Sequence, residues 1–466
     1  TREAIIAAEL DKCSILHHVQ KHQSSLFSRR TFLHIDQAST VELSQRLNEL
    51  EQQHQAFIDL QLTLDLTRGK PSSAQLDLAN GLLDAVNADN FNNDHNVDPR
   101  NYGVLDGLPA AKDLFGSILS VTEADIQQRV FVGGNSSLTL MHYTVWFAYH
   151  FGLKTGDQAW TSQVTDGEAI KMLCPCPGYD RHFSLCAQFG IEMIPVALTG
   201  EGPDMDQVEA LVKADSSIKG IWCVPRFANP TGEVYSNETV TRLAGLGKIA
   251  GDNFLVLWDN AYAVHSLNDK AKRLASIDAA AKSQGTLDHV VQFGSSSKIT
   301  FAGAGIGYLS SSEANVAGFT KHFGMATIGS DKINQLRHVR FLKDLDGVRQ
   351  HMAKHAAIIN PKFAAVAASL ATHIKDTGMG QWSDPEGGYF VSFDTLPGLA
   401  KTVVSLAAEA GVKLTPAGAT FPNGNDPQDC NIRLAPTFPE LEDVETAMAV
   451  FVNCVQLASI RQKLAS

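Results

Sequence analysis

The chain has 466 residues, of which 44% are hydrophobic and 19% are charged. This length and composition are typical of a globular enzyme with one large domain and a smaller companion. The formal net charge of −12 at pH 7 argues against nucleic acid as the main partner.

Residues 1–38 have a mixed composition and are predicted to form an N-terminal arm that packs on a dimer. They include a cluster of histidines at His17, His18 and His22 and a basic pair at Arg29 and Arg30. A histidine cluster can bind metal, but this spacing is more typical of a solvated helix face.

A helix is predicted from Ser39 to about Gln61. Ser39 and Glu42 have the spacing of a capping box, in which each side chain bonds the backbone N–H of the other residue. One apolar face then continues through Leu43, Leu47, Leu50 and Phe57. The next segment, residues 62–66, is expected to be extended.

Strand-like apolar runs alternate with helical segments from about residue 95 to about residue 345. Such alternation is typical of a mostly parallel sheet that helices cover on both faces. Farther on, a strand is predicted at 387–391 and an amphipathic helix at 440–458. We therefore expect an α/β fold with a large domain at 91–349 and a smaller α+β domain built from 39–90 and 350–466.

Asp259 directly follows residues 253–258, an apolar run that predicts a strand buried on both faces. Its carboxylate is therefore expected at the carboxyl end of the strand, where open α/β sheets bind ligands. An aspartate at such a junction often caps the next helix instead. Tyr262 lies three residues on, and a lysine follows a second strand, which favours a binding site.

That lysine is Lys298, which ends the sequence Ser295-Ser-Ser-Lys298 after the apolar run at 290–293. A lysine after serines is usually a solvated loop residue. Pyridoxal phosphate, however, needs a lysine amine for its aldehyde and a carboxylate against its ring nitrogen. Lys298 and Asp259 match these two needs.

Two further polar residues fit the same cofactor. Asn229 begins the turn Asn229-Pro-Thr-Gly232 after a predicted strand, at the edge where Asp259 lies, so its amide can bond the phenolic oxygen of the cofactor. Arg433 lies in a short apolar segment and has a guanidinium suited to a bidentate grip on an α-carboxylate. The alternative readings are a structural turn and a surface ion pair.

A phosphate site is predicted at Gly133-Gly-Asn-Ser-Ser137, which follows a strand and precedes a helix. The backbone amides at the amino terminus of a helix bind anions well. The residues expected to contribute are Gly134, Asn135 and Ser136.

In these motifs the chain resembles fold-type I pyridoxal phosphate enzymes, and among them the type Ic aspartate aminotransferases, from about Leu64 to the end. The resemblance implies that Lys298 is the Schiff-base lysine and Asp259 the partner of the pyridinium. It implies that Asn229 and Tyr262 bond the phenolic oxygen and that Arg433 binds the α-carboxylate. It also implies three further cofactor contacts, from Tyr179 stacked on the ring, Ser295 at the phosphate, and Tyr102 at the phosphate of a second subunit.

The last match implies a homodimer with composite active sites. One position departs from the family, because Ile306 occupies the place of an arginine that commonly binds the phosphate eight residues after the lysine. Lys332 is one hypothesis for the missing charge.

The implied reaction moves an amino group between aspartate and 2-oxoglutarate by a ping-pong mechanism, with Lys298 as general base. A second cation is required for the distal carboxylate. Arg68, beside Gly69 in the place of an active-site lid strand, is the favoured candidate, ahead of Lys70 and Arg226. A pyridoxal phosphate β-lyase and an aminotransferase-like regulator remain alternatives.

Seven cysteines scattered through apolar segments indicate reduced thiols. No metal site is indicated, because Cys174-Pro-Cys176 lacks a second cysteine pair. No apolar run approaches the roughly twenty residues of a membrane span, and the amino terminus lacks a signal pattern. We therefore expect a cytoplasmic protein with no membrane partner.

Overall fold

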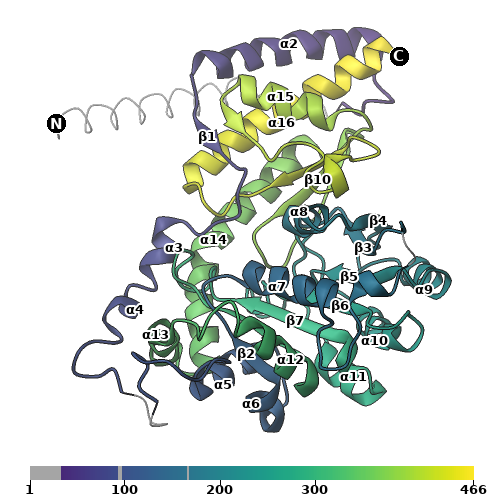
Figure 1. Ribbon diagram of the computed structural model, residues 1–466. Helices are drawn as coiled ribbons and strands as arrows, with labels where there is room; N and C mark the ends of the chain where they lie inside the picture. The colour runs from purple at the N-terminus through teal and green to yellow at the C-terminus, as the bar shows by residue number, and fades with distance from the viewer. Residues whose placement is uncertain (1–32, 93–96, 165–166) are drawn as a thin grey trace.

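The computed structural model describes residues 33–92, 97–164 and 167–466, so His17, His18, His22, Arg29 and Arg30 of the predicted arm lie outside the described residues. A seven-stranded sheet forms the larger part of the chain (Figure 1), in the order β2-β8-β7-β6-β5-β3-β4. Only β8 runs against its neighbours, so the predicted mostly parallel α/β sheet is confirmed. The strands are β2 (Val130–Val132), β3 (Lys171–Cys176), β4 (Glu192–Ala197), β5 (Ile218–Cys223), β6 (Leu255–Asp259), β7 (Val290–Ser295) and β8 (Gly307–Ser310).

Both faces of this sheet are buried, because apolar residues on successive strand positions point to opposite sides. Leu257 of β6 belongs to one apolar cluster, whereas its neighbours Val256 and Trp258 belong to another. The helices of this part are α5 (Pro109–Ile118), α6 (Ile126–Arg129), α7 (Ser137–His150), α8 (Asp180–Gln188), α9 (Met205–Ala214), α10 (Asn237–Gly245), α11 (Ile277–Gln284), α12 (Glu313–Phe323) and α13 (Lys332–Leu342).

Figure 1 shows a second layer beside this sheet, built from both ends of the described chain. Its helices are α2 (Thr40–Asp59), α15 (Ala400–Glu409) and α16 (Leu441–Ala465). It also contains a three-stranded antiparallel sheet of β9 (Gly380–Trp382), β10 (Val391–Thr395) and β12 (Asn431–Leu434), and the short parallel pair of β1 (Leu64–Asp65) and β11 (Val412–Lys413). The predicted capping box is confirmed at the start of α2.

The long helix α14 (Leu345–His373) connects the two layers. Its first turns contact α3 (Ser73–Asp77), α5 and α13, and it also packs along α16. The short helix α4 (Gly81–Asp84) contacts α13. A small cluster between the layers contains Phe227, Tyr262, Tyr389 and Phe390. This cluster joins the loops of the large sheet to the segment that leads into β10.

The strand predicted at 387–391 is wrong, because β10 begins only at Val391. Gly388 has a φ of +83°, outside the strand region, and a side chain at Gly387 would collide with the ring of Phe227. The two glycines therefore allow a close approach of the chain to the turn after β5 and do not extend the strand.

The expectation that no apolar run approaches a membrane span needs one correction. An 18-residue window of α16 has a mean hydropathy of 1.2, which by length and composition would suffice to cross a membrane. However, 78% of that window is buried inside the protein, where α16 packs against α2, α14 and α15. Its apolar character is that of a central core helix.

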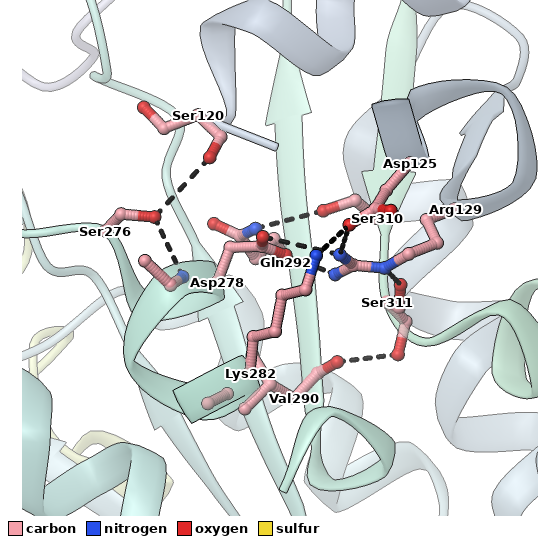
Figure 2. Close-up of polar contacts among 12 residues, drawn as sticks. Ser120, Asp125, Arg129, Ser276, Asp278, Lys282, Val290, Gln292, Ser310 and Ser311 are labelled. Carbon is pink, nitrogen blue, oxygen red and sulfur yellow. Dashed lines mark hydrogen bonds and ion pairs between the residues drawn. The ribbon is translucent and has the colours of Figure 1, made fainter. Parts of the chain in front are cut away.

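A buried ion pair fastens α11 to the antiparallel edge of the sheet (Figure 2). The guanidinium of Arg129, at the end of α6, pairs with Asp278 and donates a hydrogen bond to the carbonyl oxygen of Ser311 at 2.8 Å. A second carboxylate, Asp125, lies 3.2 Å from the same guanidinium and 2.6 Å from Nζ of Lys282. Both charges of the central pair are withdrawn from water, so each depends on the other.

Replacing Asp278 by Ala is expected to lower the free energy of unfolding by about 3–5 kcal/mol, because it leaves the buried Arg129 charge with only the partly exposed carboxylate of Asp125. Urea unfolding followed by circular dichroism measures this loss. The matched control is Asp206→Ala, whose side chain is 90% exposed in its pair with Arg242 and is expected to cost no more than about 1 kcal/mol. Equal losses in the two variants would contradict this account.

Candidate active site

A cavity of about 220 Å³ lies at the carboxyl ends of β5, β6 and β7, which is the sheet edge predicted from the sequence. Seven of the predicted site residues line it: Tyr179, Asn229, Asp259, Tyr262, Lys298, Ser136 and Ser295. The other lining residues are Ser137, Leu138, Met141, Val224, Ala261 and Ser297.

Asp259 ends β6 and has two differently placed carboxylate oxygens. Oδ2 accepts a hydrogen bond from Nε2 of His182 at 3.0 Å. Oδ1 is also buried, but it has no hydrogen-bond partner among the described residues. A buried carboxylate oxygen without a partner is costly, so this atom is prepared for a donor that enters the cavity.

His182 was missed by the sequence analysis. It lies in the first turn of α8, and its ring stacks on the indole of Trp222 with centroids 4.2 Å apart and planes inclined by 8°. The indole in turn donates a hydrogen bond to Sγ of Cys186 at 3.3 Å. Tyr179 lies three residues before His182, and the centres of the two rings are 5.0 Å apart, so the ring that lines the cavity packs on the ring that binds Asp259. This spacing was the available signal.

Lys298 is presented by the loop after β7, with Nζ 5.2 Å from the ring centre of Tyr262 and 5.8 Å from that of Tyr389. Burial lowers the pKa of its amine, the carboxylate of Asp259 opposes that change, and the nearby charge of Arg433 adds to it. A lysine whose pKa falls toward neutrality can act as a base in the physiological range.

Buried side chains hold the backbone of this lysine. The carbonyl oxygen of Lys298 lies 3.3 Å from Nε2 of His265 and 3.5 Å from the hydroxyl of Tyr389. Gln75 of α3 donates to that hydroxyl at 3.0 Å and also contacts His355 of α14 at 3.1 Å. Segments from three regions of the chain therefore meet behind the lysine.

Arg433 extends from β12 toward Asn229 and does not itself line the cavity. Its Nη1 donates to Oδ1 of Asn229 at 3.1 Å and lies 3.4 Å from Oδ1 of Asp180. Its guanidinium also lies 4.8 Å from the ring centre of Phe390. Two distant motifs of the sequence, the Asn229 turn and the β12 segment, are thus joined directly.

One end of the cavity is lined by hydroxyl groups. Ser136 caps α7 and accepts a hydrogen bond from the N–H of Leu138, so the amino terminus of that helix faces the cavity. The hydroxyls of Ser295 and Ser297 are 2.8 Å apart, and Ser297 also donates to the carbonyl oxygen of Asn135 at 3.4 Å. Gly134 binds β8 through its carbonyl oxygen, which accepts from the N–H of Gly307 at 2.6 Å.

Comparison with known proteins agrees with this geometry. A sequence profile for aspartate amino-transferase matches residues 38–466. An aspartate aminotransferase from Corynebacterium glutamicum is 43% identical over 398 residues, which cover 85% of this chain and 90% of that protein. A relative from Mycolicibacterium smegmatis is 46% identical over 415 residues, with 88% and 95% covered.

The crystal structure of an aspartate transaminase from Corynebacterium glutamicum superposes with a TM-score of 0.87 and 40% identity, covering 93% of this chain and all of that one. The chain belongs to the aspartate aminotransferase family. It is an aminotransferase with the fold-type I architecture, and membership in the family implies pyridoxal phosphate as its cofactor.

The residues of this aminotransferase fit pyridoxal phosphate. The unpartnered oxygen of Asp259 can accept a hydrogen bond from the N–H of a pyridinium, and the desolvated amine of Lys298 can bind the aldehyde. The hydroxyls and the helix end at Ser136 can bind the phosphate. One cavity thus offers partners for the three polar ends of the cofactor.

The structure does not bring every predicted residue to this cavity. Ile306 is buried in an apolar cluster, and Lys332, at the start of α13, is not among the lining residues. Tyr102 is 78% exposed. Arg68 is exposed, and Gly69 packs so closely on the ring of Phe390 that a side chain there would collide with it.

The alternative cations are engaged elsewhere. Nζ of Lys70 lies 3.7 Å from the ring centre of Phe438. Arg226 donates to the carbonyl oxygen of Ala263 and, at 3.0 Å, to the hydroxyl of Ser266. Arg226 therefore holds the loop after β6, which leaves Arg68 as the favoured candidate.

Burial lowers the pKa of His265 to about 3 and that of His355 to about 4, from 6.5. An unfolded chain takes up these protons below about pH 6.5 while the folded chain does not, so the free energy of unfolding is expected to fall between about pH 6.5 and 4. Each histidine contributes up to about 1.4 kcal/mol per pH unit.

Urea unfolding at pH 7, 6 and 5 measures this slope. His355→Gln is expected to show a shallower fall than the wild type, whereas His150→Gln, which changes an exposed histidine, serves as the control. An unchanged slope in His355→Gln would show that these histidines do not govern acid stability.

Proposed function

We propose that this aminotransferase uses pyridoxal phosphate to move an amino group between aspartate and 2-oxoglutarate in two successive half-reactions at one site. The observation that carries the proposal is a single cavity that contains both the unpartnered oxygen of Asp259 and the desolvated amine of Lys298. The choice of aspartate rests on the 43% identical relative that bears that name.

Pyridoxal phosphate, when bound, supplies an electron sink that makes the Cα–H bond of an amino acid acidic. In this proposal Nζ of Lys298 takes the Cα proton of the substrate and later returns it as a general acid. Its lowered pKa supports the role, because the amine must be neutral to accept a proton near pH 7. His182 donates a hydrogen bond to Asp259, which offsets part of the cost of burying that carboxylate.

The remaining residues orient the reactants. Asn229 and Tyr262 would bond the phenolic oxygen, and Tyr179, which lines the cavity, would stack on the ring. Arg433 would bind the substrate α-carboxylate, which fixes the bond to Cα that is broken. The contact of 3.1 Å between Arg433 and Asn229 supports placing the substrate beside the cofactor.

The phosphate would bind at Gly134, Asn135, Ser136 and Ser295, and we propose that a homodimer completes this site. The exposed side chain of Tyr102 is available to a second copy. Gly329 lies between Lys332 and the residue after Tyr102. A side-chain Cβ at Gly329 would be 3.5 Å from Nζ of Lys332 and 3.6 Å from the carbonyl oxygen of Gly103. Lys332 thus lies beside the Tyr102 loop, but its side chain is buried, so Tyr102 is the residue that would reach the partner's phosphate.

We also propose a cytoplasmic location for the enzyme. Six cysteines in the described part of the chain are unpaired, and five of them are buried. Buried thiols that form no disulfides suit a reducing compartment.

Lys298→Ala is expected to lower the rate of amino transfer by about 10³-fold or more, because both the covalent attachment and the general base are lost. Oxaloacetate formation from aspartate and 2-oxoglutarate measures the rate, and the visible spectrum of the protein reports that the cofactor still binds without a covalent bond. Substantial turnover in this variant would refute the assignment. Release of pyruvate and ammonia from a cysteine conjugate by the wild type, without oxaloacetate from aspartate, would favour a lyase.

Arg68→Ala is expected to raise the KM for aspartate about tenfold or more, because the distal carboxylate loses its cation. Lys70→Ala, two residues away, removes a charge that lies over Phe438 and is the matched control. Steady-state kinetics with aspartate and with alanine separate the effects, since alanine has no distal carboxylate. An unchanged KM for aspartate would exclude Arg68 from this role.

A further inference from the structure

The guanidinium of Arg433 is almost fully engaged before any substrate arrives. An arginine has five N–H groups, and four of those of Arg433 have partners. Nε donates to Oγ1 of Thr415 at 3.4 Å, and Nη2 donates to the carbonyl oxygen of Thr67 at 3.5 Å. Nη1 donates to Oδ1 of Asn229 at 3.1 Å and to Oδ1 of Asp180 at 3.4 Å. One N–H, on Nη2, has no partner among the residues that the structure describes.

A bidentate grip on a carboxylate requires two N–H groups, so one of these four contacts must open when substrate binds. Three of them are fixed by burial. Thr415 is buried and donates to the carbonyl oxygen of Thr67 at 3.0 Å, and Asn229 is buried beside the cavity. The carbonyl oxygen of Thr67 belongs to the backbone directly after β1, where the N–H of Leu66 is bonded to Lys413.

The contact with Asp180 is the one that can open. Asp180 is the first residue of α8, and its side chain is 34% exposed, so its carboxylate can turn into water at little cost. Its release would free an N–H on Nη1 beside the N–H already available on Nη2. These two groups form the end of the guanidinium that binds a carboxylate through both oxygens.

We propose that Asp180 is an internal carboxylate ligand of Arg433, which the α-carboxylate of the substrate displaces. This inference rests on the proposed role of Arg433 as the α-carboxylate clamp. In the substrate-free enzyme Asp180 balances a buried positive charge that would otherwise lack a counter-ion. Every incoming carboxylate competes with the Asp180 side chain for Arg433. Asp180 therefore weakens substrate binding and raises the KM.

The direction of the effect distinguishes this role from a structural one. If Asp180 only oriented Arg433, its removal would weaken the binding of carboxylates. If Asp180 competes with them, its removal strengthens their binding. Succinate is a suitable probe for the holoenzyme, since it carries two carboxylates but has neither an amino nor an oxo group to react.

Isothermal titration of the holoenzyme with succinate should give a Kd about two- to tenfold lower in Asp180→Asn than in the wild type. The KM for aspartate should fall in the same direction. Asp206→Asn removes an exposed carboxylate that pairs with Arg242 and should leave both quantities unchanged. An unchanged or higher Kd in Asp180→Asn, with an unaltered melting temperature, overturns the proposal.

Two further variants complete the experiment. Asp180→Ser carries the same expectation and replaces Asp180→Asn if that variant does not fold. Arg433→Gln tests the underlying role of the clamp, because it should abolish succinate binding. Retained binding in Arg433→Gln would refute the clamp itself, whereas lost binding there with unchanged affinity in both Asp180 variants would refute only the displacement.

Discussion

The site depends on compensating the burial of the Asp259 carboxylate. Withdrawing a carboxylate from water is costly unless other groups bind its oxygens. His182 compensates one oxygen, and its ring is itself fixed by stacking on Trp222. The other oxygen has no hydrogen-bond partner among the described residues, and Asp259 lines the cavity. This oxygen can therefore accept a hydrogen bond from the pyridinium that would bind there.

The lysine and the clamp depend on the docking of the two layers of the fold. Lys298 belongs to the large sheet, but Tyr389 from the segment before β10 and Gln75 from α3 lie behind its backbone. Arg433 comes from β12 of the smaller sheet and reaches Asn229 after β5. A change in the packing between the layers would therefore alter the proton-transferring amine and the carboxylate clamp together.

The sequence predicted those residues whose position follows from a strand end. Asp259 ends a buried strand, and Lys298 and Asn229 lie in the turns that follow two other buried strands. Parallel strands bring such residues to one edge of the sheet. His182 and Asp180 could not be placed in this way, because their contacts depend on the direction in which α8 leaves its loop. The strand predicted at 387–391 was wrong for a related reason, since its glycines serve a close approach that only the folded chain creates.

The isoleucine at position 306 leaves the proposed phosphate site without a positive charge from that position. The side chain of Ile306 lies in an apolar cluster. Its carbonyl oxygen accepts from the N–H of Ser296, and its N–H donates to the hydroxyl of Ser296, both at 2.8 Å. Ile306 therefore binds the loop that carries Lys298 and supplies no charge. A helix amino terminus contributes only about half a positive charge, and hydroxyls contribute none, whereas a phosphate carries up to about two negative charges. The lining residues therefore leave about one charge or more without compensation. A composite site, in which a second copy brings its exposed Tyr102 loop, would add a hydroxyl donor to the phosphate and would make cofactor affinity depend on dimer formation.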